Sequence, residues 1–420
     1  MRDKYALLGT DINWFGVGCG SVYPIDRDLD LWKMLARGNK EKLSDADVQA
    51  TIDRGLKFFQ PYGAAEVKTW EAHVRHNLRS HLGQKMIFYY NRATIQRVEE
   101  FETFKDEWAL EDLRSTAKGN GIGEIKIVPS PSYIDHALYW YAKSFELGGN
   151  QGVYWDNFFI APTFNTQMSD AYAEPDGRII PAAGMGALRE LARRTFIMMN
   201  ERGMLPITFP HMTSFNPLPM MAFATVQYDW EWKYSEGDVQ DRFTREQILL
   251  MSTGDLAGVW PVPLSDAGKL QDDPWTQRTF AAVRLVHELD GYGGFGGWGK
   301  AAEANLKLAA PILKILDEPG LTVYRYWDDR PQPVAATNPD VPTIVYSVPG
   351  KQAVVAAVSY SQKDENVTLA VDAKALGFAG AWRATDGETG AAVAAEGGKI
   401  NFPLKKHDVR VLVLAAEGAK

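Results

Sequence analysis

The segment Gly152-Val-Tyr-Trp-Asp-Asn-Phe158 decides how the rest of the chain is interpreted. Apolar and aromatic residues run to Trp155, and Asp156 and Asn157 follow directly. A buried strand that leaves the core at its end has this pattern. Asp and Asn are also common turn formers, so the segment alone fits a strand with an ordinary turn equally well. The neighbouring segments distinguish between these two interpretations.

Short apolar runs alternate with helical segments on both sides of this strand. Parallel strands need helical crossovers. The apolar residues at 134, 137, 138, 141 and 145 have the spacing of such a helix. The pattern predicts a (β/α)8 TIM barrel over residues 1–300. The main alternative, a doubly wound open sheet, would place its glycine-rich turn directly before a helix, whereas Gly16 and Gly18 have no adjacent helical segment. The predicted strands are 4–11, 56–62, 85–91, 124–130, 152–158, 205–211, 222–231 and 257–262.

The sequence pattern changes after residue 300. A helix over residues 301–319 is predicted to link the barrel to residues 320–420, where short alternating runs are separated by Gly, Pro, Asn and Asp. This pattern predicts a C-terminal antiparallel β-sandwich. Gly291–Gly299 contains a formal dinucleotide-binding match, but it follows a helix rather than a strand, and we interpret it as a loop at the barrel mouth.

Composition excludes several classes of protein. A net charge of −8 argues against a nucleic-acid partner, which requires a basic surface. The single Cys19 excludes an internal disulfide framework and a multi-cysteine metal site. No run of 18 apolar residues is present, so no membrane partner is predicted. The apolar start is too short for a signal peptide, which predicts a cytoplasmic protein, or a secreted or periplasmic one if an N-terminal part was removed. The oligomeric state stays open.

Polar residues gather at the predicted carboxyl ends of the strands, where barrel enzymes place their reacting groups. These ends have no Lys and no Cys, so general acid/base chemistry is favoured over Schiff-base or thiol chemistry. No metal or other cofactor is predicted, because His73, His76 and His81 are interpreted as a solvated helix face. The candidates are Asp11, Tyr90, Asn91, Asp156, Asn157, His211, Asp229, Glu231 and Trp260.

Two carboxylates near the end of the seventh predicted strand form the densest group. Asp229 and Glu231 are two residues apart, so in a strand they share a face at about 7 Å. When two carboxylates lie this close, their like charges raise the pKa of one of them. The pair then provides the one protonated and the one ionised carboxyl group that glycoside cleavage needs. The alternative is an acidic turn paired with Lys233 or Arg242.

The order of these segments resembles that of a known family. Gln151–Asn157, the polar loop after it, the helix with Arg189, Arg193 and Arg194, and the strand that ends in His211 are arranged as in glycoside hydrolase family 123-like barrel domains. Lys85–Trp108 also fits that group. The resemblance covers roughly residues 4–300 and is one of order and spacing.

The resemblance implies a glycosidase related to β-N-acetylgalactosaminidases, which use the acetamido group of the substrate as nucleophile and carry adjacent Asp and Glu. Here Trp230 separates Asp229 from Glu231, so N-acetyl specificity and the substrate-assisted route stay open. We expect an oligosaccharide or glycoside substrate, Glu231 as general acid/base, and Asp156 or Asp229 as the second carboxylate. Two alternatives are a non-catalytic carbohydrate-binding barrel and a lyase or metal-dependent hydrolase of the same fold. The expected sugar-binding residues are Asp11, Tyr90, Asn91, Asn157, His211, Trp230 and Trp260.

Overall fold

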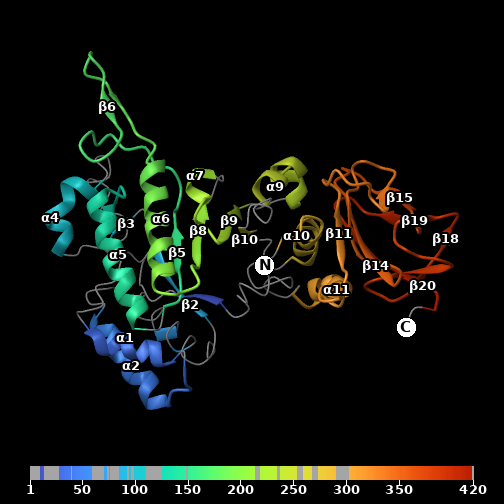
Figure 1. The fold of residues 1–420 in the computed structure, drawn as a ribbon, viewed down its shortest axis with the longest axis horizontal. Coiled ribbons are helices and arrows are strands. Elements are labelled where there is room, and N and C mark those ends of the chain that lie inside the picture. Colours follow the sequence, from blue (N-terminus) through green and yellow to red (C-terminus); the bar gives the residue numbers. More distant parts are fainter. Residues whose placement is uncertain are drawn as a thin grey trace. The chain divides into compact units, whose positions relative to one another are not determined.

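The computed structural model divides into two compact units, which are described separately below (Figure 1). The first unit comprises Met1–Asp229 and Leu256–Trp260, and the second comprises Trp230–Asp255 and Pro261–Lys420. These two units are defined by contacts between residues. The domain boundaries at residues 300 and 320, which the sequence pattern indicated, stay a prediction. The structure describes residues 10–13, 28–38, 40–58, 71–72, 75, 85–91, 94–95, 99–109, 125–147, 150–212, 218–233, 237–252, 259–266, 273–289 and 302–418.

A six-stranded sheet carries the segment that opened the sequence analysis. Its order is β1-β2-β5-β8-β9-β10, and the pairs from β1 through β9 are parallel. These strands correspond to the first, third, fifth, sixth, seventh and eighth predicted strands, so the mixed α/β character of this part is confirmed. Their bounds are β1 (Thr10–Asn13), β2 (Lys85–Asn91), β5 (Val153–Asp156), β8 (Thr208–Met212), β9 (Val226–Lys233) and β10 (Trp260–Asp266).

The second and fourth predicted strands do not lie in this sheet where the structure describes them. Residues 56–58 end helix α2 (Asp45–Phe58), because Leu56 continues the helical spacing of the buried Val48 and Ile52; residues 59–62 lie outside the described ranges. The fourth predicted strand contains β4 (Ile125–Lys126), which pairs antiparallel with β3 (Thr94–Ile95) in a separate sheet. Because β1 pairs directly with β2, the second predicted strand does not lie between the first and the third. Because β2 pairs directly with β5, the fourth predicted strand does not lie between the third and the fifth. The closed eight-stranded barrel stays a prediction.

Helices α5 and α6 cover one side of the sheet (Figure 1). Ser130 caps the start of helix α5, because its hydroxyl oxygen accepts a hydrogen bond from the Tyr133 backbone N–H. Pro131 occupies the first turn, a position that favours proline. The predicted loop 160–183 contains a hairpin of β6 (Tyr172–Ala173) and β7 (Ile179–Ile180), which projects beyond α6 in Figure 1. The helices with described backbone in this unit are α1 (Leu29–Gly38), α2, α4 (Glu99–Trp108), α5 (Pro131–Glu146), α6 (Met185–Glu201) and α7 (Leu218–Met221).

The alternation of side chains along β5 separates the core from the candidate site. Val153 and Trp155 belong to the cluster shared with the helices, and Trp155 Nε1 donates to Tyr141 Oη of α5 at 3.0 Å. Tyr154 and Asp156 are offset by one residue and therefore lie on the opposite side. On this face, the Tyr154 ring lies 5.8 Å from that of Phe209, its register partner on β8.

The second unit combines helices with two antiparallel sheets. Its helices are α8 (Val239–Arg242), α9 (Arg245–Ser252), α10 (Pro274–Val286) and α11 (Ala302–Leu313). One sheet has the order β11-β13-β14-β20-β16-β17, and the other has the order β12-β15-β19-β18. The strands are β11 (Thr322–Arg325), β12 (Val334–Ala336), β13 (Thr343–Val348), β14 (Gln352–Val358), β15 (Glu365–Val371), β16 (Trp382–Asp386), β17 (Ala392–Val393), β18 (Ala395–Glu396), β19 (Lys399–Leu404) and β20 (Val409–Ala416).

Strands β13 and β14 are buried on both faces. Val345 and Val355 belong to the core that the two sheets share, whereas Ile344 and Val354 pack with α10 and α11. This double burial explains why β14 is continuously apolar from Ala353 to Val358. Within the described part of the chain, no helix is long and apolar enough to cross a membrane.

Candidate functional site

The carboxyl ends of β5 and β8 bring together three of the predicted site residues. His211 Nδ1 lies 3.0 Å from Asp156 Oδ1. The Asn157 side-chain amide donates to Asp156 Oδ2 at 3.2 Å, and its backbone N–H donates to Oδ1 at 2.9 Å. Both oxygens of the Asp156 carboxylate are therefore oriented by neighbouring groups.

The turn after β5 is built by local sequence and by burial. Asn157 has φ 55°, in the left-handed region that Asn tolerates better than most residues. Phe158 then turns back into the core, where its ring stacks on Trp155 at 5.0 Å. The Phe158 amide donates to the His211 carbonyl at 2.9 Å, which ties the turn to β8. Asp156 is thus held at a fixed point of the sheet edge.

Tyr154 is a member of this group that the sequence prediction missed. Its Oη lies 2.7 Å from His211 Nδ1, and the two rings are 5.9 Å apart. The signal was available, since Tyr154 precedes Asp156 by two residues and shares its side of the strand. The aromatic run of β5 was interpreted as buried, which is correct for Val153, Tyr154 and Trp155, but Tyr154 is buried against His211 on the side of Asp156.

Burial differs within the group in a way that suits acid/base chemistry. The His211 side chain is 3% exposed, whereas the Asp156 side chain is 18% exposed. A partly solvated carboxylate that an imidazole and an amide orient can accept or share a proton with a bound ligand. In this group Asp156 is therefore the more accessible side chain, and His211 is its buried neighbour.

The register places the other predicted residues on adjacent strands. Asn91 pairs with Asp156, His211 pairs with Tyr228, and Met212 pairs with Asp229. Asp229 therefore directly follows Tyr228, the register partner of His211 on β9. Trp230 and Glu231 follow on β9. The side chains of Asn91, Asp229, Trp230 and Glu231 lie outside the described part of the structure.

Three further predicted residues lie away from this group. Tyr90 is 2% exposed, and its hydroxyl is 3.4 Å from Ser144 Oγ of α5, so Tyr90 packs in the core on the helix side of β2; burial also raises the pKa of its hydroxyl. Asp11 pairs with Met86, which precedes Asn91 by five positions, and its side chain is outside the described residues. Trp260 begins β10 and is partly exposed; its amide donates to Thr225 at 3.0 Å.

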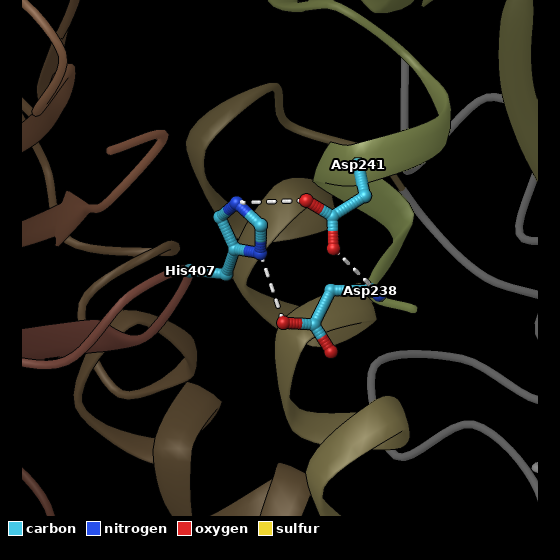
Figure 2. A group of neighbouring side chains, drawn as sticks. All are labelled: Asp238, Asp241 and His407. Atoms are coloured by element: carbon cyan, nitrogen blue, oxygen red, sulfur yellow. Dashed lines mark hydrogen bonds and ion pairs between the residues drawn. The ribbon is translucent and has the colours of Figure 1, made fainter. Parts of the chain in front are cut away.

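A second group of ionisable side chains lies within the second unit (Figure 2). His407 is fully buried in the turn between β19 and β20, and it faces Asp238 and Asp241 at the start of α8. Its Nδ1 is 2.9 Å from Asp238 Oδ2, and its Nε2 is 3.7 Å from Asp241 Oδ1. One ligand atom of each residue lies within 4.8 Å of the others, which is close enough to hold a metal ion.

The same oxygen atoms already have hydrogen-bond donors. Trp275 Nε1 donates to Asp238 Oδ2 at 3.3 Å, and Lys406 Nζ lies 3.1 Å from Asp241 Oδ1. The Lys406 ammonium and the Asp238 amide hydrogen bond hold the pKa of Asp241 below its usual value, although burial acts most strongly and in the opposite direction. A cation would have to displace the ammonium group. The arrangement fits a polar joint between α8 and the β19–β20 turn better than a metal centre. The three predicted helix histidines, His73, His76 and His81, lie outside the described residues.

No family model matches the sequence, and no curated protein is similar to it. Several solved structures of glycoside hydrolases resemble it weakly. An Anoxybacillus α-amylase has 10% identity over 96% of this chain and 92% of its own, with a TM-score of 0.47. The maltogenic α-amylase AmyB of Thermotoga neapolitana has 9% identity over 97% of each chain and a TM-score of 0.48. α-Galactosidase I of Mortierella vinacea has 12% identity over 96% of each chain and a TM-score of 0.45. Scores this low do not establish a shared fold, and identity this low does not establish a shared activity.

Proposed function

We propose that this chain is a glycoside hydrolase in which Asp156 is one of two reacting carboxylates. The contact of Asp156 Oδ1 with His211 Nδ1, at 3.0 Å, is the observation that carries the proposal. It lies at the carboxyl ends of parallel strands, where α/β enzymes bind and transform their substrates. A carboxylate that is oriented but still partly exposed is suited to a nucleophile, a base or a group that orients the substrate.

Strand β9 supplies the second carboxylate in this proposal. Glu231 is the general acid/base, and Asp229 is the alternative. Strand β9 lies two positions from β5 in the sheet, with β8 between them. Glycoside cleavage uses a pair of carboxyl groups that flank the scissile bond, and the proposal takes the second of these from β9.

In the proposal, Asn157, Asn91 and Trp230 supply amides and a ring face to the ligand, while His211 acts on Asp156 because it is almost fully buried. Trp260 is left out because it begins β10, beside the Thr225 carbonyl that precedes β9. Tyr90 is left out because its hydroxyl is used within the core, and Asp11 is left out because its register position is far from Asn91.

The finer proposal concerns the substrate and the architecture. The family 123 resemblance favours an N-acetylhexosamine glycoside of the GalNAc type, or a related glycan. The six-stranded sheet, in this proposal, belongs to a (β/α)8 barrel with an antiparallel β-sandwich after it. No cofactor takes part.

Activity on aryl glycosides with and without an N-acetyl group tests the proposal. Asp156→Asn and Glu231→Gln should each lower kcat by about 10²- to 10⁴-fold, because each removes a group that moves a proton or stabilises charge. Asp229→Asn identifies which acid on β9 is used. The exposed Asp329 in the second unit provides a matched control, and Asp329→Asn should leave kcat unchanged.

The outcomes separate the alternatives. Full activity in both Asp156→Asn and Glu231→Gln would falsify the proposal. Binding of glycans without turnover would indicate a non-catalytic binding protein. Loss of activity in a chelator would instead favour a metal-dependent hydrolase or lyase.

A further inference from the structure

Three side chains from two neighbouring strands meet at a single nitrogen atom beside the candidate carboxylate. Tyr154 Oη lies 2.7 Å from His211 Nδ1, and Asp156 Oδ1 lies 3.0 Å from the same atom. Tyr154 is 4% exposed and His211 is 3% exposed. The contact is therefore sheltered from water, while the Asp156 carboxylate remains partly accessible.

The chemistry of imidazole limits how this contact is protonated. If Nδ1 carried no proton, its lone pair would face the lone pairs of the Asp156 carboxylate, which is repulsive. If Nδ1 carries a proton, its N–H faces two oxygen acceptors, and the Tyr154 hydroxyl keeps its own hydrogen for another acceptor. The contact therefore selects a ring that carries a proton on Nδ1.

We propose that Tyr154 is a positioning residue for the Asp156 carboxylate. Tyr154 and Asp156 together keep the proton on His211 Nδ1 and fix the plane of the ring, and the ring in turn holds Asp156 Oδ1. The logic is that of a catalytic triad, in which a buried group selects the tautomer and orientation of a histidine. This inference rests on the proposed function, since it gives Tyr154 a task in the same site.

The tautomer can be measured without any activity. Nitrogen NMR of 15N-histidine-labelled full-length protein should show His211 protonated at Nδ1, with its signal identified by its loss in His211→Gln. Tyr154→Phe removes one of the two oxygen acceptors of the Nδ1–H and should shift the Nδ1 signal, while Asp156 keeps the proton on Nδ1. A wild-type ring protonated only at Nε2 would overturn the inference, and so would identical His211 signals in wild type and Tyr154→Phe.

Kinetics provide the second readout. Tyr154→Phe should lower kcat by about 10- to 100-fold, because small misplacements of a reacting group cost this much. KM should stay within about two-fold, since no substrate contact is removed. Tyr141 is a matched control, because its buried hydroxyl accepts from Trp155 Nε1 at 3.0 Å on the other side of β5. Tyr141→Phe should change neither kcat nor the His211 signals; equal effects of the two variants would indicate a general loss of packing and contradict the inference.

The two proposals fail in distinguishable ways. If Asp156→Asn keeps full activity, the role of Asp156 in the proposed function is wrong while the tautomer measurement still stands. If Asp156 is essential and Tyr154→Phe leaves both kcat and the His211 signals unchanged, only the positioning role is wrong.

Discussion

At the scale of single residues, burial decides the protonation state of His287. This side chain is 3% exposed, its Nδ1 is 2.8 Å from the Val283 carbonyl, and its Nε2 is 2.8 Å from Tyr326 Oη. The carbonyl accepts only from a protonated Nδ1, so Nε2 accepts from the tyrosine hydroxyl in the neutral ring. Loss of water around the ring lowers the pKa of His287 to about 4, and this outweighs the hydrogen bond to Val283, which acts in the opposite direction.

This shift predicts a pH dependence of stability. The unfolded chain has a histidine pKa of about 6.5 and binds a proton more readily than the folded chain, so stability is present above about pH 6.5 and is lost as the pH falls towards 4. The loss is on the order of 3 kcal/mol once the ring must charge. The free energy of unfolding, measured with urea at pH 7 and at pH 4.5, checks this.

A variant identifies the residue responsible. His287→Gln keeps one donor and one acceptor but cannot titrate, so its loss of stability between these two pH values should be smaller than that of wild type. Equal pH dependence in the two proteins would show that other groups control acid unfolding.

At the scale of elements, the distance between β5 and β8 depends on a glycine. A Cβ atom on Gly152 would lie 2.8 Å from the Ile207 carbonyl oxygen and 2.9 Å from Ile207 Cβ, which is too close. The adjacent Val153 amide donates to the same carbonyl at 2.9 Å. The strands can approach closely here only because residue 152 has no side chain.

Gly152→Ala should therefore move β5 relative to β8 and disturb the contact between Asp156 and His211. We expect a loss of about 1–3 kcal/mol in the free energy of unfolding, as for other overpacked sites, together with a lower kcat. Denaturant unfolding and kinetics at saturating substrate measure both effects.

A second glycine provides the control for this substitution. A Cβ atom on Gly186 in α6 would have no neighbour within 4 Å. Gly186→Ala should be neutral or stabilising by up to about 1 kcal/mol, because Ala favours helix more than Gly does. A similar loss of stability in both variants would argue against the close approach of the two strands as the cause.

At the scale of the whole molecule, a few side chains join segments that are distant in the sequence. In the second unit, Arg278 of α10 forms a bidentate pair with Glu388, at 2.9 and 2.8 Å, and a further bond with Asp408 at 2.6 Å. Glu388 lies between β16 and β17, and Asp408 lies between β19 and β20. The Glu388 hydrogen bond raises the pKa of Arg278. One guanidinium group thereby connects a helix to two turns more than 100 residues away.

Arg278→Met should leave two carboxylates without their cation. Removing one partner of a fully buried pair costs about 3–5 kcal/mol, and these side chains are 17–26% exposed, so we expect about 1–3 kcal/mol. Urea unfolding followed by a probe in the second unit measures the change. Lys307→Met, which removes an exposed pair with Glu303, should have no measurable effect, and a loss as large as that of Arg278→Met would refute the argument.

The local sequence was sufficient for elements whose apolar pattern matches their environment. The helical spacing predicted α5, and the apolar runs predicted β2, β5 and β8, because one face or both faces of these elements are buried. The alternating runs after residue 320 likewise predicted antiparallel strands. Local spacing failed at residues 56–58, where the same apolar residues continue a helix, and at Ile125–Lys126, where the pairing partner is Thr94–Ile95.

The sequence alone determined that Gly152–Phe158 contains a strand that ends in Asp156, since that follows from neighbouring residues. Only the tertiary structure decided that Tyr154 and His211 accompany the carboxylate, and that Tyr90 belongs to the core. The physical reason is that side-chain alternation can be read along one strand, whereas the register between strands depends on contacts between residues 55 or more positions apart.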